Sequence, residues 1–141
     1  MKLEELDLID LVSERHQQLR KVSGELWNKN SDLYISNSEW FILTRIFQEG
    51  QTTSSYITKS VDISRQGTHK FLKQLESKGL VRISKMKENK RERLLELTSL
   101  GEECVEKNQL LKRQIEQEIS EAIGEEQIIQ LKKILTSEWN L

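Results

Sequence analysis

The fold is decided by SRQGTHKFLKQLESKGLVRISKMKENKRERLLELTSLG, which occupies residues 64–101. Its first part predicts a helix, because Ser64 is a favourable N-cap residue and Gly79 is a favourable left-handed C-cap residue. Between them, Phe71, Leu72 and Leu75 recur at helical spacing and form an apolar stripe. The other face carries side chains that donate hydrogen bonds. We therefore predict a helix with one buried face and one polar face.

The second part of this stretch predicts a β-hairpin. Apolar and polar residues alternate through LVRISKM, residues 80–86, which is typical of a strand with one buried face. Residues 87–91 are polar and loop-like, and ERLLELT, residues 92–98, predicts a second strand. The tip of the hairpin is basic and carries Lys87, Lys90 and Arg91.

A short helix is predicted just before the stretch. Thr52 or Thr53 is a suitable N-cap for a helix that runs to Val61, and residues 62–64 make a tight connection to the next helix. Two short helices joined by a three-residue turn are the helix-turn-helix arrangement. Followed by a basic hairpin and by Thr98, which caps a further helix, this arrangement predicts a winged helix. The order of the elements is more specific than any one of them.

Long helices are predicted on both sides of this core. Apolar residues at helical spacing predict an amphipathic helix over residues 3–28, and a second helix starts at the N-cap Ser36 or Asn37. Residues 99–141 are also helical by pattern, and Gly124 divides them into two helices. The chain has no proline, which favours such long helices.

The charge is unevenly distributed along the chain. The whole sequence carries 22 basic and 23 acidic residues, for a formal net charge of −1. Residues 59–93 contain eleven basic and four acidic residues, a net charge of +7, and the rest of the chain carries −8. Such a basic segment gains affinity for a phosphate backbone by releasing counterions, even in a slightly acidic protein. A solvated lysine-rich face is the alternative interpretation.

Residues 64–101 resemble the MarR family of winged helix-turn-helix transcriptional regulators. The family joins a recognition helix ending in Leu-Glu-x-x-Gly-Leu to a basic wing and a Leu-Thr-x-x-Gly motif. The resemblance covers nearly the whole chain, although only residues 61–101 are specific. The resemblance implies a homodimer that binds a pseudo-palindromic operator, usually as a repressor. Many members of the family release this DNA when a small phenolic ligand or an oxidant acts on them. The matching positions are Leu75, Glu76, Gly79, Leu80, Leu97, Thr98 and Gly101.

The chain departs from the family pattern at several positions. Asn89 stands two residues before the wing Arg91, where the family commonly has Asp, so the negative charge that would orient the arginine is lost. Asp62 replaces the turn glycine, and Thr68 replaces an apolar residue of the recognition helix. Gly67 lies inside that helix at a cost of about 1 kcal/mol relative to alanine. These departures indicate a divergent member with an altered sequence preference.

The first group of predicted DNA-contacting residues lies on the recognition helix. Arg65 and Gln66 fall in its first turn, where either can make bidentate contacts to base edges. Lys70 and Lys73 suit phosphates, because an ammonium carries charge without a fork geometry. A solvated surface residue is the alternative for His69. The predicted set is Ser64, Arg65, Gln66, Thr68, His69, Lys70 and Lys73, in which Thr68 and His69 suit either a base or a phosphate.

The second group lies in the wing. Arg91 is placed to enter a minor groove, with Lys87 and Lys90 on the adjacent phosphates, and Asn89 completes the set. A loop that touches only phosphate is the alternative.

The sequence lacks the patterns of an enzyme or a metal protein. We find no paired carboxylates, nucleophile with a base, phosphate-binding glycine loop or metal-ligand spacing, so we predict no enzymatic activity, metal or cofactor. The single Cys104 lies among Glu102, Glu103 and Glu106, which disfavour a thiolate, and is predicted to be inert. No stretch suits a membrane span or signal peptide, so a cytoplasmic location is expected.

The predicted fold class is mainly α with a small β-hairpin, an α+β winged helix-turn-helix with N- and C-terminal dimerisation helices. We predict one domain over residues 1–141, with a DNA-binding core at about 36–98 and dimerisation helices at about 1–30 and 99–141. The predicted function is sequence-specific regulation on double-stranded DNA as a homodimer at an inverted repeat, with a small-molecule effector of unknown identity. The alternative is a winged-helix module for a protein partner, since one fold hosts unrelated functions.

Overall fold

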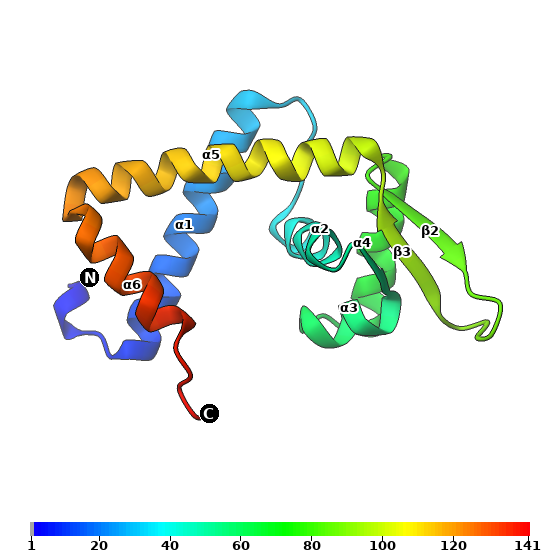
Figure 1. Ribbon diagram of the computed structural model, residues 1–141, viewed down its shortest axis with the longest axis horizontal. Helices are drawn as coiled ribbons and strands as arrows, with labels where there is room; N and C mark the ends of the chain where they lie inside the picture. Colours follow the sequence, from blue (N-terminus) through cyan, green and yellow to red (C-terminus); the bar gives the residue numbers. More distant parts are fainter. Residues whose placement is uncertain (1) are drawn as a thin grey trace. The chain divides into compact units, whose positions relative to one another are not determined.

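The computed structural model describes residues 2–141 and has the predicted helices and hairpin in the predicted order (Figure 1). Two compact units make up the chain, one of residues 24–108 and one of residues 2–23 with 109–141. The mainly α winged helix-turn-helix fold is confirmed. The elements are η1 (Leu3–Glu5), α1 (Leu8–Asn30), α2 (Asn37–Glu49), β1 (Gln51–Thr53), α3 (Ser54–Ser60), α4 (Arg65–Ser77), β2 (Val81–Lys85), β3 (Arg93–Leu97), α5 (Ser99–Ile123) and α6 (Glu125–Thr136).

The helices of the 24–108 unit start where the sequence places cap residues. Ser36 caps α2 in a reciprocal box, in which its side chain accepts from the Glu39 N–H and the Glu39 side chain accepts from the Ser36 N–H. Thr53 caps α3 and Ser64 caps α4, each by accepting a hydrogen bond from a backbone N–H three residues on. The tight connection between α3 and α4 bends at Asp62, which has a φ of +52°.

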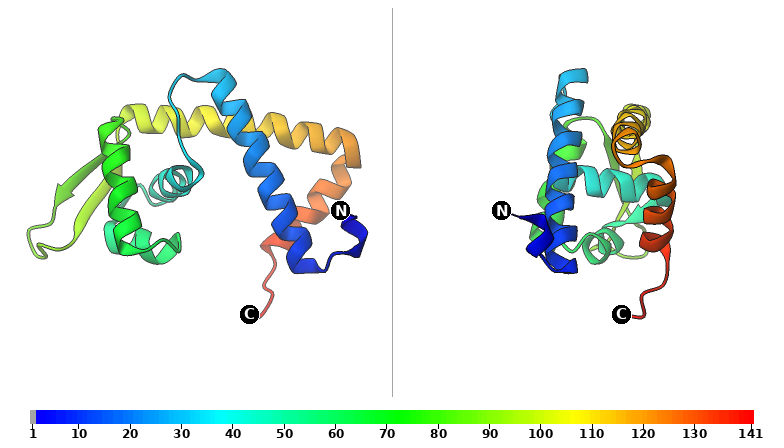
Figure 2. Two further views of the ribbon diagram at one scale, coloured as in Figure 1. Left: turned by 180° about the vertical axis from the view of Figure 1, so that it is seen from behind. Right: turned by 90° about the vertical axis from the view of Figure 1, so that its left-hand side faces the viewer.

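The hairpin forms as predicted and belongs to a three-stranded antiparallel sheet of order β1-β3-β2. The β2–β3 register pairs Val81 with Leu97 and Lys85 with Arg93. Figure 2 shows the hairpin from behind, and in both Figures 1 and 2 its loop extends to one side of α4. The strand β1 was not predicted, because two of its three residues, Thr52 and Thr53, were interpreted as candidate helix caps.

The core of the 24–108 unit combines side chains from the helices with the inner face of the sheet. Ile46, Ile57, Leu75 and Leu95 are completely buried and come from α2, α3, α4 and β3. Trp27 packs edge-on against Trp40, with ring centroids 4.9 Å apart, and its indole N–H donates to the Leu33 carbonyl. Other buried core residues include Ile42, Leu43, Leu72, Leu80 and Val81.

A single corner joins the end of α4, both ends of the hairpin and the start of α5. Gly79 has a φ of +76°, and the Leu80 N–H donates to the Leu75 carbonyl, which closes a left-handed helix end. The Thr98 N–H donates to the Leu80 carbonyl and its hydroxyl to the Gly79 carbonyl. The same hydroxyl accepts from the Gly101 N–H and so caps α5, as predicted. The Leu-Glu-x-x-Gly-Leu and Leu-Thr-x-x-Gly motifs therefore meet in space.

The predicted first helix is corrected at its N-terminus. It was expected from residue 3, but a short 3-10 turn occupies Leu3–Glu5 and α1 starts only at Leu8. The reason is Asp7, whose carboxylate accepts from the Asp10 N–H and interrupts the apolar periodicity with a cap.

The second unit exposes many of its apolar residues, although Leu111 and Ile115 of α5 are buried. No residue of α6 is buried, and Ile129, Leu131, Ile134 and Leu135 are each about half exposed. Gly124 separates α5 from α6, as predicted, and has a φ of +99°. Among the described residues, no helix combines the length and apolar character that a membrane crossing requires.

The corner predicts a strong effect of one added methyl group. A Cβ on residue 101 would lie 2.1 Å from the Leu80 carbonyl oxygen, which is backbone and cannot rotate away. Gly101→Ala should therefore lower the free energy of unfolding by about 3 kcal/mol. Gly24→Ala is the control, because its Cβ would meet nothing within 4 Å and alanine should stabilise α1 by roughly 0.5 to 1 kcal/mol. Urea denaturation measures both, and equal stabilities of the two variants would contradict the close contact.

Candidate nucleic-acid interface

The start of α4 presents an exposed polar face. Arg65, Gln66, His69 and Lys73 are exposed, whereas Leu72 and Leu75 point into the core. Ser64 is exposed too, but its hydroxyl is used to cap the helix. Because the period of the helix puts one side in the core, the other side is left as a continuous row of hydrogen-bond donors.

Gly67 has a steric reason to be in this helix. A Cβ at this position would lie 2.7 Å from Ile63 Cγ2 and 3.1 Å from Ser64 Oγ. The tight connection between α3 and α4 leaves no room for a side chain here. Glycine at this position lowers the stability of the helix, but it allows the close packing of α4 against the turn that precedes it.

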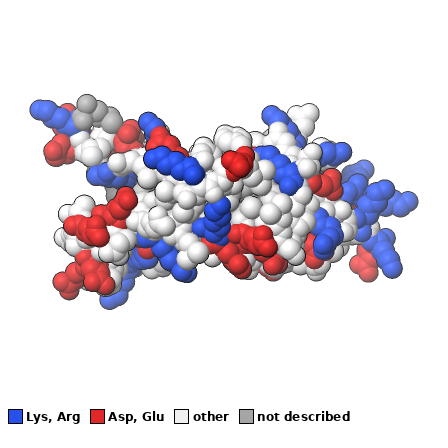
Figure 3. Space-filling model, turned by 90° about the horizontal axis from the view of Figure 1, so that it is seen from above, with Lys and Arg blue, Asp and Glu red and all other residues white. Residues whose placement is uncertain are grey.

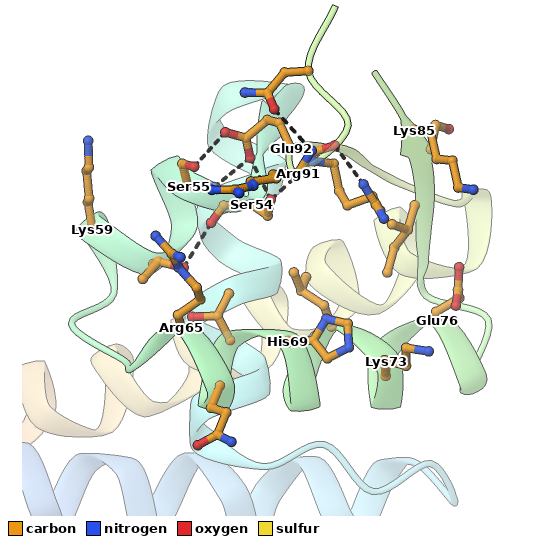
Figure 4. Close-up of a pocket in the computed structure, with 18 residues that line it drawn as sticks. Ser54, Ser55, Lys59, Arg65, His69, Lys73, Glu76, Lys85, Arg91 and Glu92 are labelled. Carbon is orange, nitrogen blue, oxygen red and sulfur yellow. Dashed lines mark hydrogen bonds between the residues drawn. The ribbon is translucent and has the colours of Figure 1, made fainter. Parts of the chain in front are cut away.

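A cleft runs between α4, the start of α3 and the hairpin (Figure 4). In Figure 4, Arg65, His69 and Lys73 of α4 face it from one side, and Arg91 of the wing lies on the other side. The structure brings six predicted site residues besides Thr68 into its lining, namely Arg65, Gln66, His69, Lys73, Asn89 and Arg91. The remaining predicted residues, Ser64, Lys70, Lys87 and Lys90, are exposed outside this lining.

The expectation for Thr68 is corrected. Thr68 borders the floor of the cleft but is only 2% exposed, and its hydroxyl donates to the Ser64 carbonyl one turn earlier. With its polar atom satisfied inside the helix, the side chain packs with the apolar stripe rather than facing outwards. It therefore serves the core in place of an apolar residue.

The wing loop is held by hydrogen bonds within itself. The Asn89 side-chain oxygen accepts from the Arg91 N–H at 3.0 Å, and the Asn89 carbonyl accepts from the Glu92 N–H at 3.2 Å. The Arg93 guanidinium donates to the Lys90 carbonyl at 2.7 Å. Asn89 thus holds the backbone of Arg91 by a hydrogen bond to its N–H.

Glu92 is a residue of the cleft that the sequence did not single out. Its carboxylate accepts hydrogen bonds from the hydroxyls of Ser54 and Ser55 and from the Ser55 N–H, at 2.5 to 2.9 Å. Burial acts to raise the pKa of Glu92, but the hydrogen bonds from Ser54 and Ser55 outweigh it and lower the pKa to about 2. The partners are 37 and 38 residues away, so no local pattern signals them.

The basic segment contributes less free charge than its composition implies. Lys78 is paired at 2.8 Å with Glu39, which is 1% exposed, and it also donates to the Tyr34 carbonyl. Arg82 pairs with Glu96 across the hairpin at 2.9 Å. In Figure 3, Lys and Arg nonetheless gather at the right-hand edge, where the hairpin lies. The cations left for a ligand are those of the α4 face and the wing, together with the exposed Lys59 of α3 and Lys85 of β2 that also line the cleft.

Among the described residues, neither Cys104 nor a cluster of potential metal ligands forms a second candidate site. Burial raises the pKa of the Cys104 thiol, with Lys107 opposing and Glu103 adding to the shift. The thiol is 7% exposed, so it is a poor candidate for a reactive sensor. Residues 2–141 hold no group of three or more potential ligands that could bind a metal ion.

The α3–α4 pair followed by the basic hairpin defines the class of protein, a winged helix-turn-helix protein. The family model described as the MarR family matches residues 35–92. Residues 35–92 are therefore similar to the MarR family, in agreement with the motifs.

Known proteins are similar to this chain in sequence and in fold. The uncharacterized HTH-type transcriptional regulator YdgJ of Bacillus subtilis (strain 168) is 31% identical over 93 residues, which are 66% of this chain and 57% of that protein. This chain thus aligns with a little over half of that relative. The apo form of wild-type MarR from E. coli superimposes with a TM-score of 0.79 at 21% identity, over 92% of this chain and 95% of that one. A cysteine-to-serine MarR mutant from E. coli complexed with operator DNA gives 0.76 at 22% identity, over 94% and 93%. These structural likenesses show the fold.

The lowered pKa of Glu92 predicts an acid-sensitive contribution to stability. The ionised form is favoured by folding, so its stabilisation is complete above pH 4.5 and is lost as the pH falls toward about 2. Glu92→Gln cannot titrate, and its melting temperature should therefore fall less over this interval than that of the wild type. Ser54→Ala combined with Ser55→Ala should reduce the difference, because the donors that lower the pKa are removed. Identical acid profiles of wild type and Glu92→Gln, followed by circular dichroism, would contradict the assignment.

Proposed function

We propose that this protein is a sequence-specific regulator that binds double-stranded DNA as a homodimer. The observation that carries the proposal is the cleft, where the donor face of α4 and the wing Arg91 line one continuous surface. A duplex presents base edges in its grooves and phosphates along its ridges. A protein that reads its sequence therefore combines a helix that fits a groove with flanking cations that contact the phosphates.

The α4 helix would enter the major groove. Arg65 and Gln66 are exposed in its first turn, where side chains of a recognition helix contact base edges. Arginine suits guanine and glutamine suits adenine, because each can form two parallel hydrogen bonds to these bases. Lys70 and Lys73 lie further along the helix and are suited to phosphates.

The wing would contact the flanking DNA. Arg91 lines the cleft while its backbone is held by Asn89, which leaves the guanidinium available for a narrow minor groove. Lys87 and Lys90 are exposed on the same loop and are suited to the adjacent phosphates.

A second copy would cover the exposed apolar residues of the second unit. Leu8, Ile9 and Val12 of α1 are 66%, 76% and 47% exposed, and α6 buries none of its residues. Apolar surface of this extent is costly in water, and a twofold interface lets each patch contact its copy. Two α4 helices would then read an inverted repeat, with half-sites about 10 base pairs apart. Repression and release by an effector stay predictions that rest on the resemblance.

Binding to duplex DNA tests the proposal directly. A random pool of duplexes of about 30 base pairs is enriched for binders, and affinity is measured by fluorescence anisotropy between about 50 and 200 mM salt. Affinity should fall steeply with salt, because phosphate contacts release counterions. Arg65→Ala should weaken binding to the enriched duplex by about 5- to 150-fold and leave binding to the random pool nearly unchanged.

The control is Arg113→Ala, which removes an exposed arginine of α5 that does not line the cleft. It should leave both affinities unchanged. An absence of duplex binding by the wild type at the lower salt concentration would leave the alternative, a winged helix that binds a protein partner.

The homodimer predicts a specific response to charge. Leu131 and Leu135 are 46% and 54% exposed, so replacing both by Glu should not unfold the chain itself. It should place like charges in a twofold interface and shift a dimer to a monomer at micromolar concentration. Sedimentation velocity with circular dichroism measures both properties. A wild type that sediments as a monomer would refute the dimer, and so would a fully dimeric double variant.

A further inference from the structure

Glu92 connects the wing to the helix-turn-helix at a point far from the corner at Thr98. Ser54 Oγ donates to one carboxylate oxygen at 2.6 Å, the Ser55 N–H donates to the same oxygen at 2.9 Å, and Ser55 Oγ donates to the other at 2.5 Å. The Arg93 N–H in turn donates to Ser54 Oγ at 3.2 Å. Hydrogen bonds to an ionised carboxylate are about twice as strong as neutral ones, and these lengths are typical of them.

The carboxylate of Glu92 is satisfied without a cation. Its oxygens accept from serine donors, and it forms no salt bridge within the described part of the chain. Arg91, the next residue along the loop, therefore lies beside a fixed carboxylate that does not neutralise it. In Figure 4, Glu92 lies with Ser54 and Ser55 at one end of the cleft, and Arg91 is next to them.

Two further side chains of the wing, those of Asn89 and Arg93, form hydrogen bonds with the backbone of the loop. Asn89 accepts from the Arg91 N–H, and the Arg93 guanidinium donates to the carbonyls of Lys90 and Glu92. The side chains of Asn89, Glu92 and Arg93 are thus engaged with the backbone of the loop or with α3. Arg91 is exposed and lines the cleft.

From this arrangement we propose that Glu92 is a positioning residue for DNA binding: it anchors the wing to Ser54 and Ser55 and thereby presents Arg91 to the duplex. The proposal rests on the proposed DNA-binding function and deepens it. Pre-organising a loop lowers the entropy that binding must otherwise spend on ordering it. An acidic residue in a DNA-facing cleft then strengthens binding, against the sign of its own charge.

The sign of the effect separates this role from simple electrostatics. Near phosphates, removing a negative charge should strengthen binding if only repulsion matters. Glu76 is the matched control, because it is an exposed acid that lines the same cleft from the end of α4. Glu76→Gln should leave affinity unchanged or raise it slightly, whereas Glu92→Gln should lower it.

A double-mutant cycle with Arg91 provides the test, using the enriched duplex pool of about 30 base pairs as the probe. Glu92→Gln, and separately the Ser54→Ala and Ser55→Ala pair, should each weaken binding about tenfold. In an Arg91→Ala background the same changes should have less than about a twofold effect, because no positioned guanidinium remains to be lost. Circular dichroism identifies any variant that fails to fold, and amide hydrogen exchange in residues 86–92 should be faster in Glu92→Gln than in Glu76→Gln.

Each outcome is decisive. If the wild type does not bind duplex DNA, the proposed function fails. If it binds but Glu92→Gln strengthens binding, or if the effects of Glu92 and Arg91 are additive, the positioning role is wrong while DNA binding stands. Tenfold weakening by both sets of variants, lost in the Arg91→Ala background, supports the proposal.

Discussion

The close approach of Gly101 to the Leu80 backbone is the contact on which the winged core depends. Leu80 lies between the end of α4 and the start of β2, and Thr98 lies between the end of β3 and the start of α5. Four secondary-structure elements therefore meet at one point. A glycine is required there because any side chain would overlap a backbone oxygen. The hairpin is attached to the recognition helix at this corner, and near its loop Glu92 attaches it to α3. The wing is therefore held at two points, and both attachments determine the direction in which the loop between β2 and β3 points.

The ionised side chains divide into those that hold the fold and those that remain for a ligand. Lys78 lies within the basic segment, yet it compensates the buried carboxylate of Glu39 and so joins α4 to the capping box of α2. Such a pair is costly to break, because it would leave a buried charge unpaired. Arg65 and Arg91, by contrast, are exposed around the cleft. A count of charges along a sequence cannot make this division, since it depends on which partner each residue meets.

Local signals explain why most of the fold was predictable. Ser36, Ser64 and Thr98 each accept a hydrogen bond from the backbone N–H three residues later, so a short stretch of sequence is enough to recognise them as caps. Gly79, with its positive φ, is recognised as a helix end from the neighbouring residues. Thr68 was misplaced because a hydroxyl that bonds to its own helix is compatible with a buried face, which composition does not reveal. Glu92 and the strand β1 were missed for a different reason. Their partners lie some 40 residues away, and only the assembled sheet brings them together.

The strand order β1-β3-β2 has a consequence for aggregation. The longest run of apolar strand residues, in β3, is enclosed between two neighbours, so its backbone is unavailable to another chain. The outer strands are short, and β2 carries Arg82 and Lys85, charges that discourage edge-to-edge addition of a foreign strand. The hairpin can thus project into solvent without acting as a template for amyloid-like pairing.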